Sequence, residues 1–148
     1  MRKLDKMDLQ LVKVLSQNSR LTYKELAELL STTRQRVARR MEKLKRLGVI
    51  KKFTVIPNFE KLGYAYVILA VSLRPGTDIN TIIERLQARE EVKIIEKGIG
   101  AHSLIIHVLV PKELKGAEER VEEIMNELKE AERIDVTFVS DVVKFELI

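Results

Sequence analysis

STTRQRVARRMEKLKRLGVIKKF, residues 31–53, is the stretch that decides the fold of the N-terminal part of the chain. It carries nine Lys or Arg residues and a single acid, Glu42. At the helical period of about 3.6 residues, Val37, Met41 and Leu44 fall on one side, and most of the basic residues fall on the other. The pattern predicts a helix that packs through its apolar side and presents positive charge on its outer side.

This basic outer side differs from an ordinary solvated helix face, which mixes both signs and carries ion pairs one turn apart. With Glu42 as the single acid, like charges repel one another with little local compensation. A bound polyanion would supply the missing sign. We therefore interpret the helix as a candidate nucleic-acid-binding element.

Charge is distributed unevenly along the whole chain. Residues 1–52 hold 15 Lys or Arg and 5 Asp or Glu, a balance of +10. Residues 53–148 hold 12 and 17, a balance of −5, so that the two parts sum to the net charge of +5. This asymmetry predicts a polyanion-binding module joined to a module with another task.

The composition of the 148 residues indicates a globular protein, since 45% of them are apolar. No apolar run approaches the roughly 20 residues that span a bilayer, and the N-terminus lacks the apolar core of a signal peptide. The chain has no cysteine, so it has no disulfide and no thiolate metal site. We expect a cytoplasmic protein that does not enter a membrane.

Two further helices precede the basic one. Asp5 is a candidate N-cap for the first, and a T-x-x-E capping box beginning at Thr22 starts the second. After a short turn, Thr32 or Thr33 caps the basic helix, which ends at Gly48. Two short helices, a tight turn and a basic outward helix describe a helix-turn-helix, whose second motif helix enters the DNA major groove. RNA is the weaker alternative, because its A-form groove is narrow.

Depth in the groove assigns the roles of the candidate contact residues. The N-terminal residues of the basic helix would reach base edges, where Arg suits guanine and Gln suits adenine, and later residues would contact phosphate. Arg40 alternatively pairs with Glu25 or Glu28 at a helix junction. The two lysines after Gly48 lie in a predicted wing strand beside the DNA backbone. The predicted DNA-binding residues are Arg34, Gln35, Arg36, Arg39, Arg40, Lys43, Arg46, Lys51 and Lys52.

Beyond a hinge at Pro57, strand and helix patterns alternate in the order βαββαβ. This order is typical of a ferredoxin-like fold, an antiparallel sheet with both helices on one face. The predicted fold class is therefore α+β, with a three-helix winged helix-turn-helix domain followed by a ferredoxin-like α/β sandwich. The predicted domains are a DNA-binding domain over 1–50, a wing strand and linker over 51–62, and a dimerisation and effector-sensing domain over 63–148. Strands are expected at 64–73, 92–99, 103–110 and within 135–148.

Both faces of the predicted sheet are largely apolar. In 64–73 one face offers Tyr64, Tyr66 and Ile68, while the alternate residues are apolar as well. Two helices cover only one face, and the chain has no third layer for the other. A second subunit packed sheet to sheet is the expected cover, and a two-fold dimer would also present two recognition helices to a palindromic site.

The connection between the two middle strands is a candidate effector site. Gly98 and Gly100 would let a ligand approach the backbone, and His102 and Ser103 could bind a carboxylate or an amine. The alternative is a domain that only dimerises. His102 and His107 are expected on opposite strand faces, without clustered carboxylates, a phosphate loop or a nucleophile motif. We therefore expect no enzyme, no cofactor and no metal site.

The whole chain resembles the Lrp/AsnC family, the leucine-responsive or feast/famine transcription regulators. The resemblance is carried by LDKMDLQLVKVLSQNSRLTYKELAELL (4–30), by TRQRVARRMEKLKRLGVIKKFTVIPNFEKLG (33–63) and by the βαββαβ order that follows. It implies a homodimer formed through the C-terminal sheet, often assembled into an octamer, that binds promoter DNA. It also implies an amino-acid effector bound between C-terminal domains.

Two departures from the family pattern bear on these expectations. The family connection commonly reads Gly-Asp-Tyr-Asp, but here both acids are missing, since Ala101 and Ser103 take their places. The ligand is then either unusual or absent. The turn before the basic helix has Leu30-Ser31-Thr32 where a glycine is common.

We therefore predict a sequence-specific DNA-binding transcription regulator that binds palindromic promoter sites as a dimer or larger oligomer. An amino acid or another small effector would modulate it. The alternative is a small-molecule-sensing oligomer whose basic module docks an acidic protein or an RNA partner.

Overall fold

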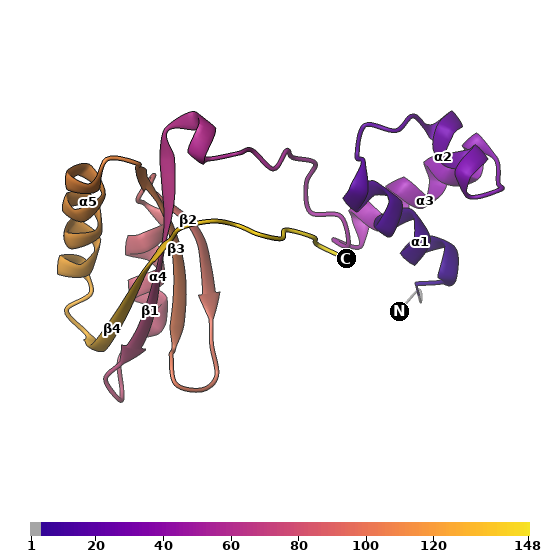
Figure 1. Ribbon diagram of the computed structural model, residues 1–148. Coiled ribbons are helices and arrows are strands. Elements are labelled where there is room, and N and C mark those ends of the chain that lie inside the picture. Colours follow the sequence, from indigo (N-terminus) through magenta and orange to yellow (C-terminus); the bar gives the residue numbers. More distant parts are fainter. Residues whose placement is uncertain (1–3) are drawn as a thin grey trace. The chain divides into compact units, whose positions relative to one another are not determined.

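The structure, a computed structural model, describes residues 4–148 (Figure 1). The chain divides into two compact units, of which the first comprises Met1–Ile56 and Val143–Ile148 and the second Pro57–Val142. Each unit has its own apolar core. No helix within the described residues combines the length and the apolar character needed to cross a membrane.

The first unit contains three helices, α1 (Lys6–Gln17), α2 (Tyr23–Leu29) and α3 (Arg34–Arg46). Their apolar stripes meet in one cluster, as the helical spacing predicts. The side chains buried in this cluster are Leu11, Leu15, Leu26, Ala27, Val37, Met41 and Leu44. Because α3 commits Val37, Met41 and Leu44 to this core, its polar residues are left on its other sides.

Each helix of the first unit begins at a side-chain cap. Asp5 caps α1 and forms a reciprocal capping box with Asp8, and Thr22 caps α2 through the predicted box. Thr33, rather than Thr32, caps α3 by accepting a hydrogen bond from the Arg36 backbone N–H at 3.3 Å. These caps satisfy backbone donors that short helices would otherwise expose.

The turn between α2 and α3 contains a strained residue. Ser31 has a φ of +50°, the left-handed conformation that L residues rarely adopt outside turns. Glycine adopts it without a steric cost. The missing glycine noted in the sequence therefore coincides with a position where the backbone favours glycine.

The wing strand expected within residues 51–62 is not formed. In the part of the chain that the structure describes, residues 51–58 have no regular secondary structure, and Glu60–Leu62 form a 3-10 turn. The apolar residues of this segment are exposed; Val55, for example, has 80% of its surface accessible. Their spacing resembled a strand, but a strand needs a hydrogen-bonded neighbour, and this segment has none within residues 4–148.

The second unit has the predicted order βαββαβ. Its elements are β1 (Tyr64–Leu73), α4 (Ile79–Gln87), β2 (Val92–Lys97), β3 (Leu104–Pro111), α5 (Leu114–Glu127) and β4 (Ala131–Val139). The four strands form one sheet in the order β2-β3-β1-β4, and all three pairings are antiparallel. The final strand ends at Val139, earlier than predicted, and residues 140–148 have no regular structure.

Both helices of the second unit cover the same face of the sheet. In β1, Val67, Leu69 and Val71 are fully buried, and the register pairs Leu69 with Ile106 of β3. These residues share one cluster with apolar residues of α4 and α5, such as Ile82 and Ile124. The alternate strand residues, including Ile68 and Ile105, lie on the opposite face and are partly exposed. We call this opposite face, made by Tyr64, Tyr66, Ile68, Ala70, Ile94, Ile105, His107 and Leu109, the open sheet face.

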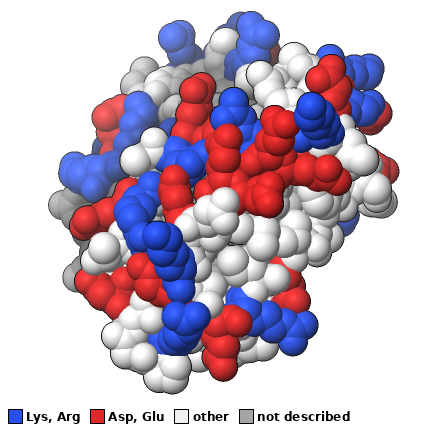
Figure 2. Space-filling view, turned by 90° about the vertical axis from the view of Figure 1, so that its left-hand side faces the viewer, with Lys and Arg blue, Asp and Glu red and all other residues white. Residues whose placement is uncertain are grey.

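Three arginines on the helical side of the second unit, Arg85, Arg89 and Arg120, form ion pairs with nearby glutamates. Figure 2 looks at the molecule from the side on which α5 lies in Figure 1, and acidic and basic side chains are interleaved across that view. Arg89 forms the centre of one network, with contacts of 3.1 Å to Glu91, 3.0 Å to Glu123 and 2.6 Å to Glu127. A network of several charges around one arginine contributes more to stability than isolated surface ion pairs do.

Candidate nucleic-acid interface

Five residues of the predicted DNA-binding set are exposed along α3: Arg34, Gln35, Arg36, Arg39 and Arg46. Within residues 4–148, none of these five side chains makes an ion pair or a hydrogen bond. The outer side of the helix therefore presents a row of exposed donors without a protein partner among the described residues. Arg and Gln donors in this arrangement can bind phosphate oxygens or base edges.

The first turn of α3 runs against the usual electrostatic preference. A helix N-terminus carries partial positive charge and is stabilised by acids in its first turn. α3 has no acid there and has Arg34 and Arg36 instead. These two arginines oppose the helix dipole, so a role in folding does not account for them. A bound anion would remove the conflict.

Lys45 is the cation of α3 that has a partner on the same helix. Its Nζ lies 2.9 Å from Glu42 Oε1, and the pKa of Lys45 is raised by this hydrogen bond. Because Glu42 is the only acid of the helix, the remaining cations of α3 have to find partners on other elements.

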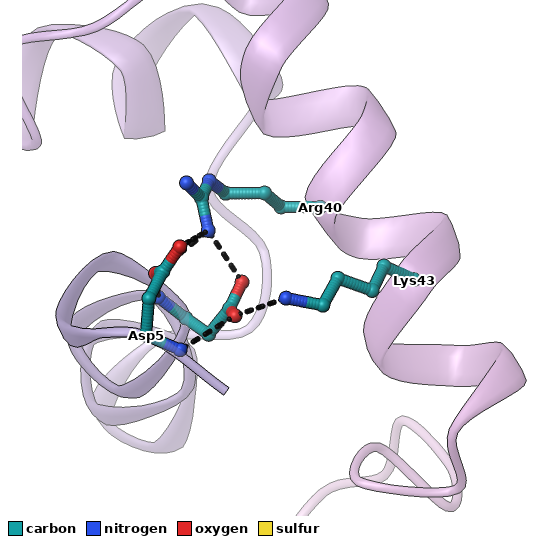
Figure 3. Close-up of polar contacts among 4 residues, drawn as sticks. Asp5, Arg40 and Lys43 are labelled. Carbon is teal, nitrogen blue, oxygen red and sulfur yellow. Dashed lines mark hydrogen bonds and ion pairs between the residues drawn. The ribbon is translucent and has the colours of Figure 1, made fainter. Parts of the chain in front are cut away.

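Arg40 and Lys43 have such partners, because both side chains turn toward α1 (Figure 3). Arg40 Nη1 lies 2.7 Å from Asp5 Oδ2 and 2.7 Å from Asp8 Oδ1. Lys43 Nζ lies 2.5 Å from Asp8 Oδ2. The Lys43 side chain therefore lies against α1 and not with the exposed basic residues of α3 (Figure 3).

The prediction for Arg40 was right in one respect and wrong in another. Arg40 does pair at a helix junction, but with the aspartates of α1 and not with Glu25 or Glu28. Both α3 cations lie on one flank of the helix, since Arg40 and Lys43 are three residues apart. The position of a residue around the helix axis does not predict where a long lysine side chain ends. The Lys43 side chain extends from this flank to a buried carboxylate.

Asp8 is the acidic centre of this junction, and its side chain is fully buried. Burial by itself raises the pKa of a carboxyl group, but hydrogen bonds from Lys43, from the Asp5 backbone N–H and from Arg40 outweigh it. Together they lower the pKa of Asp8 to about 2. The hydrogen bonds of Arg40 to the side chains of Asp5 and Asp8 raise the pKa of Arg40. Asp8 is therefore a permanent anion at neutral pH.

No role of Asp8 was predicted from the sequence, although a usable signal existed. The spacing of Asp5 and Asp8 is that of a reciprocal capping box, and the structure has both of its hydrogen bonds at 3.0 Å. What the spacing does not indicate is the second use of the Asp8 carboxylate, which binds cations 32 and 35 residues further along the chain.

Lys51 and Lys52 follow α3 and are exposed. They lie in the irregular segment 51–58 and not in a wing strand. Neither lysine makes an ion pair within the described residues. Their charges remain available to a polyanion, although no sheet holds them in place.

The candidate effector residues lie in the hairpin connection between β2 and β3, residues 98–103. A side chain at position 98 would not fit, because a Cβ there would lie 2.5 Å from the backbone oxygen of His102. Gly100 has a φ of +144°, a conformation that also favours glycine. The two glycines therefore shape the hairpin itself.

His102 and Ser103 use their polar atoms within the chain. The Ser72 hydroxyl donates to the Ala101 carbonyl at 2.7 Å, so it accepts from His102 Nδ1 at 3.2 Å. His102 Nε2 lies 3.6 Å from Asp135 Oδ2. Ser103 Oγ accepts from the Leu73 backbone N–H at 3.4 Å. The connection is thus tied to β1 and β4 through the residues that were predicted to hold a ligand.

The arrangement of acids and histidines does not form a metal centre. Over residues 4–148 there is no group of three or more His, Asp or Glu side chains that could hold a metal ion. His107 instead lies 3.3 Å from Glu96 on the open sheet face.

Comparison with known proteins places both units in one family. Residues 4–51 match the family model described as winged helix-turn-helix DNA-binding. The HTH-type transcriptional regulator PH0061 of Pyrococcus horikoshii is 50% identical over 148 residues, the full length of both chains. The crystal structure of PH0061 matches over the full length of both chains with a TM-score of 0.94.

Two more distant structures share the fold. E. coli AsnC is 20% identical, covers 99% of this chain and 98% of its own, and has a TM-score of 0.83. The regulator NMB0573 of Neisseria meningitidis, solved in complex with L-Met, is 20% identical, covers 97% and 94%, and also has a TM-score of 0.83. PH0061, the relative that is 50% identical, is described as a transcriptional regulator, in agreement with the expectation that the chain is not an enzyme. The chain belongs to the Lrp/AsnC family of helix-turn-helix transcriptional regulators.

Proposed function

We propose that this regulator recognises a specific DNA sequence by inserting the N-terminal half of α3 into the major groove. The observation that carries the proposal is the row of exposed, unpaired donors on α3. Arg34 and Arg36 also stand where the helix dipole disfavours cations, which a phosphate or a base acceptor would compensate.

Within this contact set, depth divides the roles. The residues nearest the helix N-terminus, Arg34, Gln35, Arg36 and Arg39, read base edges. Arg46 at the far end of α3, together with Lys51 and Lys52, contacts phosphate. Arg40 and Lys43, held by the aspartates of α1, are not part of this contact set.

The test is Arg39→Ala in a binding-site selection followed by gel shifts. Duplexes selected by the wild type from a random pool supply the specific site, and scrambled duplexes supply the non-specific one. We expect Arg39→Ala to weaken specific binding about 10- to 100-fold, as removal of one bidentate base contact does, and non-specific binding much less. Arg120→Ala, which removes an exposed arginine of α5 in the second unit, is the matched control.

Equal losses on both duplexes would move Arg39 to a phosphate role. Absence of retardation of any duplex by the wild type at low salt would reject DNA binding. A basic module that docks an acidic protein or an RNA would then be the better explanation.

We also propose that the open sheet face packs against the same face of a second copy, which gives a homodimer. Its central residues, such as Ile68, Ile105 and Leu109, are apolar and only partly covered in one chain. Burial of exposed apolar surface against a partner contributes favourable free energy to association. A two-fold dimer would present two α3 helices to a palindromic site.

Ile105→Glu tests this interface by placing a charge at its centre. We expect a monomer in size-exclusion chromatography with light scattering, whereas Leu114→Glu, at an exposed apolar residue of α5, leaves the assembly unchanged. The wild-type mass in the same measurement distinguishes a dimer from an octamer. An oligomer that survives Ile105→Glu would place the interface elsewhere.

The proposed effector site is the hairpin connection at Gly98, Gly100, His102 and Ser103. The L-Met complex of NMB0573 supports an amino-acid ligand for a relative of the same fold. Ala101 and Ser103 stand where the family pattern has acids. We therefore propose a ligand whose amino group does not need a carboxylate of the protein beside it. Calorimetric titration with each amino acid tests this. Binding that survives His102→Ala would place the ligand elsewhere, and no binding would leave the unit with dimerisation alone.

A further inference from the structure

The junction of α1 and α3 places two cations of the recognition helix on one buried anion. Asp8 is fully buried. It accepts from Lys43 at 2.5 Å, from Arg40 at 2.7 Å and from the Asp5 backbone N–H at 3.0 Å. Asp5 adds a second contact of 2.7 Å to Arg40. Both carboxylate oxygens of Asp8 are therefore occupied by donors from within the first unit.

This arrangement makes Asp8 a competitor of DNA for two cations. Turning Lys43 or Arg40 toward a phosphate would leave a buried carboxylate with fewer partners. Breaking one side of a buried ion pair costs far more than the release of a single counterion from DNA returns. The side chains of Arg40 and Lys43 are also only 19% exposed, in contrast to the outer residues of α3.

The two contacts also fix how α3 is turned about its axis. Arg40 and Lys43 are three residues apart on one flank, so they fasten two successive turns of α3 to the start of α1. Rotation of α3 toward the DNA would stretch both contacts at once. The orientation that points Arg34, Gln35 and Arg39 outward is thereby held by charge in addition to the apolar stripe.

We propose that Asp8 is a specificity-determining positioning residue, which withholds Lys43 and Arg40 from the DNA backbone so that the outer residues of α3 dominate recognition. The proposal rests on the proposed function, since it concerns the same DNA-binding helix. Phosphate contacts supply affinity for every sequence, whereas base contacts discriminate. A protein that keeps two cations from phosphate therefore binds random DNA less tightly relative to its specific site.

The experiment measures how the affinity of the full chain for a random duplex depends on salt. The magnitude of the slope of log K against log salt is about 0.9 for each phosphate that the protein neutralises. Lys43→Gln is compared with Arg46→Gln, a residue of the same helix without an ion pair among the described residues. We expect Lys43→Gln to leave the wild-type slope unchanged. Arg46→Gln should reduce it by the equivalent of about one phosphate.

A double-mutant cycle then tests the role of Asp8 itself. Asp8→Asn should steepen the slope by the equivalent of one to two phosphates and lower the ratio of specific to random affinity, because the released cations reach phosphate. Adding Lys43→Gln to Asp8→Asn should reduce the slope by about 0.9, although the same substitution has no effect in the wild type. If Asp8 only maintained the fold, Lys43→Gln would change the salt slope equally in the wild type and in Asp8→Asn.

Three results are decisive. A slope that falls in Lys43→Gln as it does in Arg46→Gln overturns the proposal, because Lys43 would then contact DNA in the wild type. An unchanged slope in a folded Asp8→Asn variant also overturns it. If Asp8→Asn does not fold by circular dichroism, the comparison of Lys43→Gln with the wild type decides alone. Failure of the wild type to bind any duplex at low salt rejects the proposed function, and this inference with it.

Discussion

Two arginines, Arg39 in the first unit and Arg89 in the second, show how differently the two units use positive charge. Arg89 contacts three carboxylates at 2.6–3.1 Å, and its side chain is 18% exposed. Arg39 is exposed and meets no acid within residues 4–148. The chain builds a network of opposite charges around Arg89, on the side where acidic and basic side chains are interleaved in Figure 2, so the absence of acids around Arg39 is a property of the site.

The boundary between the two uses of charge runs through α3 itself. Arg40 and Lys43 are paired in the manner of Arg89, whereas Arg34, Arg36 and Arg39 on the same helix are not. Paired cations connect elements of the fold, and unpaired cations are left for a partner of opposite charge. Each of the following predictions tests one side of this distinction.

The largest effect is expected for Asp8→Ala, which removes the anion that joins α1 to α3. Loss of one side of a buried ion pair destabilises by about 3–5 kcal/mol. Amide hydrogen exchange read by mass spectrometry should show faster exchange in α1 and α3, with β1 and β3 unchanged. Glu28→Ala, at an exposed acid of α2, is the control and should change neither. Equal protection in both variants would show that the junction contributes no stability.

Acid should weaken the first unit through the same residue. The pKa of Asp8 is about 2 in the folded protein, below its ordinary value of 3.8. A depressed pKa contributes stability that is fully present above 3.8 and is lost as the pH falls through about 2. The shift corresponds to roughly 2 kcal/mol. Urea unfolding between pH 5 and pH 2 measures it, and the part of the loss due to Asp8 should vanish in Asp8→Asn.

Replacing Arg89 and Arg39 by Leu compares the two kinds of cation directly. Arg89→Leu leaves three neighbouring carboxylates, two of them partly buried, without their shared cation and should cost about 1–2 kcal/mol of the second unit's stability. Arg39→Leu should change stability by less than about 0.5 kcal/mol, because an exposed residue without contacts holds nothing together. Thermal unfolding of both variants gives the answer. A comparable loss for Arg39→Leu would mean that it, too, serves the fold.

The smallest effect is expected for Ser31→Gly in the turn between α2 and α3. Relief of the left-handed conformation at φ +50° favours glycine, while the greater freedom of glycine in the unfolded chain opposes it. We expect the free energy of unfolding of the first unit to rise by about 0.5–1 kcal/mol, as measured by urea unfolding. Ser31→Ala, which keeps the Cβ, should give no gain.

Local sequence patterns predicted the elements that depend on neighbours in the sequence. The capping box at Thr22, the stripe of Val37, Met41 and Leu44 and the alternation in β1 were each confirmed. These features repeat at fixed spacing along one helix or strand, so a single sequence contains enough information to place them.

Most of the contacts that the sequence did not reveal join residues far apart in the chain. Lys43 finds Asp8 at a distance of 35 residues, and His102 finds Ser72 at a distance of 30. A charged or hydroxyl side chain indicates what kind of partner it requires, but the sequence does not indicate which residue supplies that partner. The wing strand failed for a related reason, because the apolar residues of 51–58 have strand-like spacing without a neighbouring strand.

The crowding at Gly98 bears on how the hairpin between β2 and β3 can change over evolution or in the laboratory. Backbone atoms, and not a movable side chain, occupy the space that a methyl group would need at this position. A library randomised over 98–103 should therefore recover glycine at 98 among its folded members while tolerating variety at Ala101. New ligand preferences would then arise by exchanging side chains on a loop whose path is already set.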